Sequence, residues 1–120
     1  MAISNNAKKI LSIGLNALTE KKAEHITIKD ITDISVISDV LVIASGNNIN
    51  QLHAMADEIQ KNLNDNKIPH MSIEGYDKAN WILMDYNDVI FHLFDKESRN
   101  FYDLDRLYYD AKELNLSDFN

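Results

Sequence analysis

The chain has 120 residues, 45% of them hydrophobic, and a formal net charge of −7 at pH 7. One domain of this length can bury a core, and the absence of Cys excludes disulfides, thiolate metal sites and a Cys nucleophile. With 19 acidic residues against 12 basic ones and no basic stripe, the composition argues against binding to a bare phosphate backbone and favours a basic protein partner.

The sequence gives no sign of a membrane or export segment. No apolar run approaches the roughly 20 residues that a membrane span needs, and residues 1–9 lack the apolar core of a secretory signal. We therefore expect a cytoplasmic protein with no membrane partner and no direct sequence-specific binding of nucleic acid.

Residues 3–22 carry apolar side chains at the spacing of an amphipathic helix, with Ser4 or Asn5 as the N-terminal cap. Gly14 within it costs about 1 kcal/mol relative to Ala, which indicates a close packing contact at that point. Residues 25–30 then alternate as in a half-exposed strand near a sheet edge. Residues 31–38 mix Ile with Asp and Ser and predict an irregular connection.

Residues 40–44 form a continuous apolar run, typical of a strand buried on both faces. Residues 45–48 break this strand and supply helix caps. The clearest helix follows, because its apolar residues fall on one stripe: Leu52, Met55, Ala56, Ile59 and Leu63. Asn66 can cap its end, and residues 71–74 and 75–80 predict a short strand and a loop.

Residues 81–94 predict an antiparallel hairpin, because two apolar runs flank the polar pair Asn87–Asp88. Both residues of the pair tolerate the positive φ of a tight turn. Alternation puts Trp81 and Leu83 on one face with Asp85, and Tyr86 on the other. Both faces are apolar, so the hairpin needs a cover on each side, and the sequence leaves open which face points outward.

The last segment repeats Phe101, Leu104, Leu107 and Tyr108 at helical spacing. With Tyr102 and Tyr109 it carries more apolar surface than one helix face can hide, which indicates docking on the sheet plus a contact outside the chain. We expect Arg99 and Arg106 to pair with acidic groups of the same chain. The domain is expected over residues 1–114, followed by a polar, frayed tail at 115–120.

The element order is therefore helix, two strands, helix, three strands, helix. It predicts a single-domain α/β fold with a mixed sheet of about five strands and helices mainly on one face. A parallel pair is expected across the strand–helix–strand passage in the middle of the chain.

Candidate chemistry is sparse. Asp85 and Asp88, with Asp39, could hold a divalent metal, but no Gly-rich phosphate loop with its Lys accompanies them, and Asp88 is a natural turn residue. His53 and Asp57, four residues apart on a helix, more often form an exposed hydrogen bond than a metal site. His92 interrupts an apolar strand and either finds a partner inside the protein or serves a partner protein.

Five motifs in register over about residues 5–111 resemble the ribosomal silencing factors of the RsfS/Iojap family. They lie at residues 39–47, at Gln51 with residues 54–57, and at residues 74–76, 81–94 and 99–108. Three positions differ from the usual pattern of the family: Asn87 replaces Gly, Val40 replaces an aromatic residue and Asn50 replaces Arg. Asn87 still accepts positive φ, so the hairpin is retained, and the other two replacements change side chains without changing the family that the motifs indicate.

The resemblance implies a nucleotidyltransferase-like fold without its catalytic loop, and a homodimer. It also implies binding to ribosomal protein L-fourteen on the large ribosomal subunit, which blocks joining of the small subunit and lowers translation under nutrient limitation. On this interpretation we expect no enzyme activity, catalytic residue, metal or cofactor. The alternative is a divalent-metal enzyme resembling the nucleotidyltransferases. The expected partner-binding residues lie on and around the hairpin: Glu74, Tyr76, Trp81, Leu83, Asp85, Tyr86, Asp88 and His92.

Overall fold

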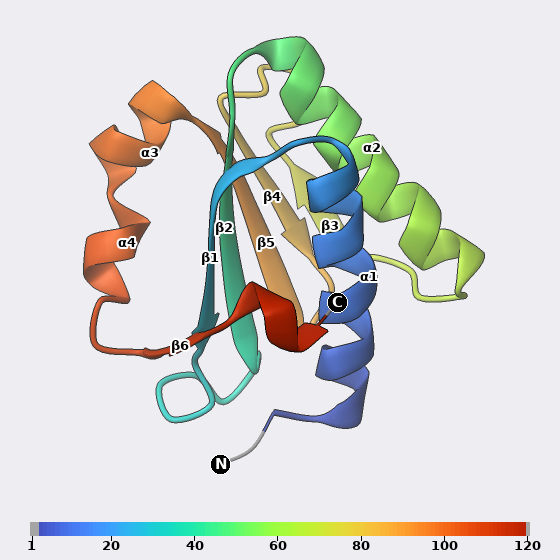
Figure 1. Ribbon diagram of the computed structural model, residues 1–120, viewed down its shortest axis with the longest axis vertical. Helices are drawn as coiled ribbons and strands as arrows, with labels where there is room; N and C mark the ends of the chain where they lie inside the picture. Colours follow the sequence, from blue (N-terminus) through green and yellow to red (C-terminus); the bar gives the residue numbers. More distant parts are fainter. Residues whose placement is uncertain (1–2, 120) are drawn as a thin grey trace.

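The computed structural model describes residues 3–119, and they form a six-stranded sheet between two layers of helices (Figure 1). The strand order is β3-β4-β5-β2-β1-β6. The elements follow in chain order: α1 (Asn5–Glu20), β1 (Glu24–Asp30), β2 (Val40–Gly46), α2 (Ile49–Asp65), β3 (Ser72–Glu74), β4 (Trp81–Asp85), β5 (Val89–Asp95), α3 (Lys96–Tyr102), α4 (Leu104–Leu107), β6 (Lys112–Leu114) and the 3₁₀ helix η1 (Leu116–Phe119).

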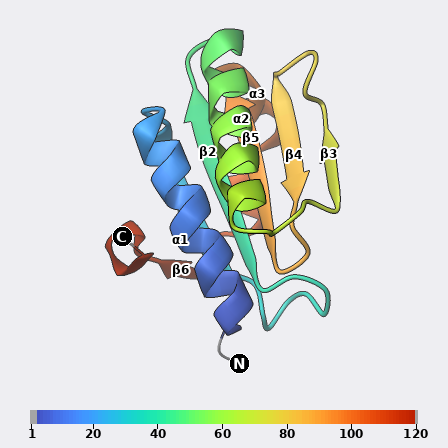
Figure 2. The ribbon, with the colours of Figure 1, turned by 90° about the vertical axis from the view of Figure 1, so that its right-hand side faces the viewer.

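The two long helices begin where the sequence supplies caps. The Ser4 hydroxyl accepts a hydrogen bond from the backbone N–H of Ala7 at the start of α1, and the Asn48 side chain accepts one from Gln51 at the start of α2. Asn66 ends α2 as predicted. The apolar stripes of both helices are buried against one face of the sheet, where α1 and α2 lie side by side (Figure 2).

The parallel pair β2–β5 forms the centre of the sheet, in a register that runs from Val40 opposite Val89 to Gly46 opposite Asp95. All other neighbouring strands are antiparallel. Strands β4 and β5 form the predicted hairpin, and Asn87 in its turn has a φ of +69°. The expectation of positive φ holds for Asn87 and not for Asp88.

The predicted class, a single α/β domain with a mixed sheet, is confirmed, and the structure adds detail at three points. The strand paired in parallel with β2 is β5 and not β3, the next strand along the chain. A sixth strand, β6, pairs with the edge of β1. Residues 116–119 form η1, where Leu116 and Phe119 pack against the main core, so the expectation of a frayed tail is wrong for them.

A second, smaller core lies on the opposite face of the sheet from α1 and α2. Its buried members are Ile31, Leu41, Ile43 and Phe94. Leu104 and Tyr108, from α4 and the turn after it, pack onto this cluster. The layer formed by α3 and α4 therefore covers only part of this face of the sheet, namely β1, β2 and the end of β5 (Figure 1).

Candidate partner-binding site

Strands β3, β4 and β5 have one face that α1 and α2 do not cover, which we call the open half-sheet. A partner could contact the predicted binding residues on this face. Ile82 and Met84 of β4 are buried in the main core under the long helices, so Trp81, Leu83 and Asp85 point to the opposite face. Directly paired residues share a face, which adds Glu74 beside Leu83 and Ile90 beside Asp85. The structure thereby settles which face of the hairpin points outward.

The side chains of this half-sheet are half-buried or exposed. Leu83, Asp85 and Ile90 are half-buried and Glu74 is exposed. The second core lies over the neighbouring strands β1 and β2 instead. Two aliphatic side chains are thus framed by carboxylates, a composition suited to the centre and rim of a protein interface.

Trp81 lies at the border between this open half and the α3 layer, and it is held from three sides. Its ring lies 5.0 Å from that of Phe94 and 4.5 Å from that of Tyr102, measured between centroids. Its indole N–H donates a hydrogen bond of 3.0 Å to Nδ1 of His92. The side chain is half-buried, so it still reaches the surface in a fixed orientation.

His92 is 7% exposed and serves Trp81 rather than the surface. Because Nδ1 accepts the indole proton, the ring is neutral with its own proton on Nε2. Burial lowers the pKa of His92 to about 4, which keeps the ring in this acceptor form at neutral pH. Of the two roles predicted for His92, the structure shows the internal hydrogen bond.

Two carboxylates of the predicted set take part in the turn region. Asp85 accepts a hydrogen bond of 2.8 Å from the backbone N–H of Asn87, and Asp88 accepts one of 2.8 Å from the Asn6 side chain. Each of these contacts uses one carboxylate oxygen. Asp85 therefore stabilises the turn and places negative charge at this end of the open half-sheet, whereas the Asp88 carboxylate lies against the start of α1.

Tyr76 and Tyr86 are the predicted binding residues that the structure turns away from the open face. Tyr86 is 3% exposed and packs edge-on against Phe91 in the main core, where burial raises its pKa to about 12. Tyr76 stacks on His53 of α2, and its hydroxyl donates a 2.8 Å hydrogen bond to Asp57. This hydrogen bond raises the pKa of Tyr76. Both tyrosines face the long-helix layer, so neither lies on the open face with Trp81 and Leu83.

His53 and Asp57 on α2 both form hydrogen bonds with Tyr76. Nε2 of His53 lies 2.6 Å from the carbonyl oxygen of Tyr76, while Asp57 holds the Tyr76 hydroxyl. The two α2 residues thus fix the loop between β3 and β4. The hydrogen-bonding alternative is the one that the structure shows, with Tyr76 as the partner of both.

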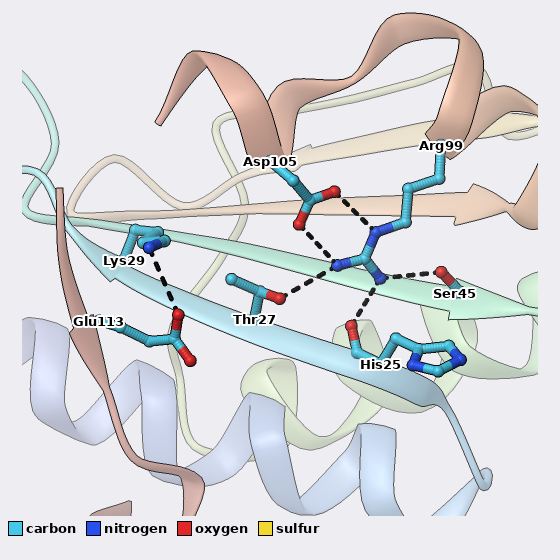
Figure 3. Close-up of polar contacts among 7 residues, drawn as sticks. All are labelled: His25, Thr27, Lys29, Ser45, Arg99, Asp105 and Glu113. Atoms are coloured by element: carbon cyan, nitrogen blue, oxygen red, sulfur yellow. Dashed lines mark hydrogen bonds and ion pairs between the residues drawn. The ribbon is translucent and has the colours of Figure 1, made fainter. Parts of the chain in front are cut away.

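A network around Arg99 holds the α3–α4 layer on the sheet (Figure 3). The guanidinium donates two hydrogen bonds of 2.9 Å to the Asp105 carboxylate, and the others go to Ser45, Thr27 and the carbonyl oxygen of His25. These five bonds match the five N–H groups of an Arg side chain. Arg99 therefore links α3 and α4 to both β1 and β2.

Two further features belong to this network. The hydrogen bonds from Arg99 lower the pKa of Asp105, and nearby Lys29 forms an ion pair of 3.3 Å with Glu113 of β6 (Figure 3). Intramolecular pairing is thereby confirmed for Arg99, whereas Arg106 forms no ion pair with the residues in 3–119.

A polar hollow of about 510 Å³ borders Arg99, between His25, Lys96 and Asn100.

The sequence did not reveal this network because Arg99 and Asp105 lie six residues apart, which is no helical spacing, and its other partners lie more than 50 residues away. The left-handed conformation of Asp103, with a φ of +51°, turns the chain between α3 and α4 and brings Asp105 back to Arg99.

The carboxylates of the alternative metal site accept hydrogen bonds from other groups of the chain. Asp39 accepts one of 2.8 Å from the Ser4 backbone N–H, Asp85 accepts one from the backbone N–H of Asn87, and Asp88 accepts one from the side-chain amide of Asn6. Across residues 3–119, no three His, Asp or Glu side chains are grouped so that they could hold a metal ion. The same stretch contains no helix long and apolar enough to cross a membrane.

Comparison with known proteins decides the family. Residues 4–120 match the family model described as "Ribosomal silencing factor during starvation". The chain belongs to this family. The ribosomal silencing factor RsfS of Bacillus subtilis is 40% identical over 106 residues, which cover 88% of this chain and 90% of that protein. The resemblance found in the sequence is thereby confirmed, and with it a ribosome-associated silencing role.

Two solved structures extend the comparison to the fold. A crystal structure from Bacillus halodurans superposes with a TM-score of 0.80 at 33% identity, covering 89% of this chain and 97% of that one. A crystal structure from Chromobacterium violaceum gives a TM-score of 0.82 at 25% identity, covering 90% and 87%. The fold of this ribosomal silencing factor family member is therefore shared along nearly its whole length.

Proposed function

We propose that this chain represses translation without enzymatic chemistry, by binding ribosomal protein L-fourteen on the large ribosomal subunit and blocking access of the small subunit. Translation would thereby fall when nutrients are limiting. The observation that carries the proposal is the open β3-β4-β5 half-sheet, where Leu83 and Ile90 lie between carboxylates and beside a rigidly held Trp81. Family membership supports the ribosome as the place of action.

The physical case rests on pre-organisation and charge. A stable interface of roughly 1,200–2,000 Å² suffices to occupy a site that subunit joining needs. Trp81 is an anchor of the type enriched in binding hot spots, and its three contacts reduce the entropy lost on binding. Glu74 and Asp85 on the open half-sheet complement a basic partner and steer its approach.

A homodimer is also part of the proposal. Large apolar side chains on the α3–α4 layer lie exposed, with Phe101 at 80%, Leu107 at 71% and Tyr109 at 78%. A second copy would remove this surface from water. Sedimentation of the purified chain, compared with a variant carrying both Phe101→Ser and Leu107→Ser, tests it: the wild type is expected as a dimer and the double variant as a monomer. A monomeric wild type would rule the dimer out.

Co-sedimentation with purified large subunits tests the main proposal. Wild type is expected to pellet with the subunits, and Trp81→Ala to remain in the supernatant. Because Trp81 also packs internally, Glu74→Lys provides a surface variant, which reverses one charge on the open half-sheet. Glu20→Lys on the exposed end of α1 makes the same change of charge on the other side of the molecule and is the matched control.

Binding by the control and loss of binding by Glu74→Lys and Trp81→Ala would support the site. If wild type fails to pellet with large subunits, the proposed function is wrong. A subunit-joining assay by light scattering then tests the mechanism, since wild type should prevent the two subunits from joining while Glu74→Lys should not. Binding without any effect on joining would overturn the steric mechanism.

A further inference from the structure

The connection between β1 and β2 exposes three aliphatic side chains close together in sequence. Ile34 is 61% exposed, Val36 is fully exposed and Ile37 is 72% exposed. Single exposed apolar residues are normal on protein surfaces, but a cluster on one loop marks an interaction site or an aggregation hazard. The exposed aliphatic side chains of this loop therefore indicate a binding site for a partner.

The loop is held in one shape by its own hydrogen bonds. The carbonyl oxygen of Ile31 accepts bonds of 3.0 and 2.8 Å from the backbone N–H groups of Ile34 and Ser35. The Ser35 hydroxyl accepts bonds from the backbone N–H groups of Ile37 and Ser38. The exposed aliphatic side chains are thus presented on a pre-organised backbone, which lowers the entropy cost of docking.

The loop also adjoins the open half-sheet described above. The Ser38 hydroxyl donates a hydrogen bond to the carbonyl oxygen of Asn87 in the β4–β5 turn. The backbone N–H of Asp39 donates one of 2.9 Å to the carbonyl oxygen of Asp88. The loop projects from the sheet toward the side of α3 and α4 in Figure 1 and lies beneath the ends of β4 and β5 in Figure 2. It therefore borders the end of the open half-sheet where Asp85 lies.

We propose that Ile34, Val36 and Ile37 form a second apolar contact for the same basic ribosomal partner. This inference rests on the proposed function and extends its surface around the β4–β5 turn. The partner must combine apolar groups with positive charge, because Asp33 and Asp110 line a hollow beside Ile34, and Glu74 and Asp85 lie on the open half-sheet. A second copy of this chain fits poorly, since a two-fold contact here would bring these carboxylates toward one another.

The test measures affinity for purified large subunits and for isolated ribosomal protein L-fourteen. Val36→Asp and Val36→Lys both remove the apolar contact, and only the second adds a charge that a basic partner repels. We expect affinity to fall about tenfold for Val36→Asp, which corresponds to one hot-spot side chain, and further for Val36→Lys. Raising the salt concentration should reduce the difference between the two variants.

Ile49→Lys is the matched control, because this exposed aliphatic residue follows the opposite end of β2. It should bind as wild type does. Unchanged thermal unfolding of all three variants is expected, since neither Val36 nor Ile49 is buried. The loop contact is supported if the two Val36 variants lose affinity and the control does not.

Three other results overturn it. If both Val36 variants bind like wild type while Glu74→Lys does not, the loop contact is wrong and the proposed function stands. If the Val36 variants change only the oligomeric state measured by analytical ultracentrifugation, the loop belongs to a contact between copies. Failure of wild type to bind either probe would refute the proposed function, and the loop contact with it.

Discussion

The indole N–H of Trp81 donates a hydrogen bond to Nδ1 of His92 on the neighbouring strand, so a surface residue and a buried one form a single unit. Protonation of His92 would place a second N–H against the indole donor and break this bond. Trp81 is then fixed only by its contacts with Phe94 and Tyr102. The position of the proposed anchor thus depends on a neutral His92.

The first prediction concerns pH. The pKa of His92 is lowered from 6.5 to about 4 by burial, so between these values the unfolded chain binds more protons than the folded one. The contribution of His92 to the free energy of unfolding is therefore complete above pH 6.5 and declines as the pH falls toward 4. At pH 5 it should be reduced by about 2 kcal/mol.

Urea unfolding at pH 7.5 and 5 measures this, with His92→Gln as the comparison. Gln cannot titrate, yet its side-chain oxygen can accept the indole proton. All other ionisable groups are the same in both proteins, so the difference between the two pH dependences isolates His92. Equal losses of stability in wild type and variant would contradict the assignment.

The second prediction concerns the network of Arg99. Arg99→Lys retains the charge but cannot form the two parallel bonds to Asp105 or reach all the other acceptors. We expect a loss of about 2 kcal/mol in the free energy of unfolding, as for removal of charged hydrogen bonds. Arg106→Lys on α4 is the control and should have little effect, because its exposed side chain has no ion pair within residues 3–119.

A double-mutant cycle with Asp105→Asn separates this pair from the remaining contacts of Arg99. The two substitutions should show a coupling energy, since each removes the same charge-assisted bonds. Strict additivity would indicate that the bonds to Ser45, Thr27 and His25 carry the stability. Large-subunit binding should weaken as well, because Tyr102 on α3 supports Trp81.

Elements that depend on interactions between near neighbours in the chain are the ones that the sequence predicts. The stripe of α2, the cap Ser4 and the hairpin turn at Asn87 depend on neighbours within a few residues, and the sequence predicted all three. β6 was missed because the three residues Lys112–Leu114 carry no alternating pattern, and they form a strand only by pairing with β1.

The binding site was predicted in part for the same reason. Alternation along β4 correctly grouped Trp81 with Leu83 and Asp85, but only the packing of α1 and α2 shows that this face is the open one. Alternation also placed Tyr86 on the opposite face, which the structure shows to be buried. The contacts of Tyr76 with α2 span about 20 residues and left no local signal.

The third prediction concerns Gly14, whose place in the middle of α1 indicated a close contact. A Cβ atom at this position would overlap the ring of Phe91 on β5. Gly14→Ala should therefore destabilise the protein by about 1–3 kcal/mol, as overpacking does, although Ala favours the helix by about 1 kcal/mol. Thermal or urea unfolding measures the net change.

Phe91→Leu provides the compensating variant for Gly14→Ala. Alone it should destabilise the core by removing ring volume. In combination it should recover part of the loss caused by Gly14→Ala, because the smaller side chain leaves room for the added methyl group. A stabilising effect of Gly14→Ala alone would show that helix propensity outweighs the contact with Phe91.

The fourth prediction concerns the ionic-strength dependence of binding to large subunits. Glu74 and Asp85 lie at the surface of the open half-sheet, so their attraction to a basic partner is screened by salt. Raising the salt concentration from about 0.05 M to about 0.3 M should lower the affinity, mainly through a slower association rate. The slope should be smaller for Glu74→Gln, which removes one charge, and unchanged for Glu20→Gln on the opposite side of the molecule. If Glu74→Gln and Glu20→Gln show the same salt dependence as wild type, the acidic rim does not steer the partner, and Trp81 and Leu83 would have to carry recognition by apolar contact.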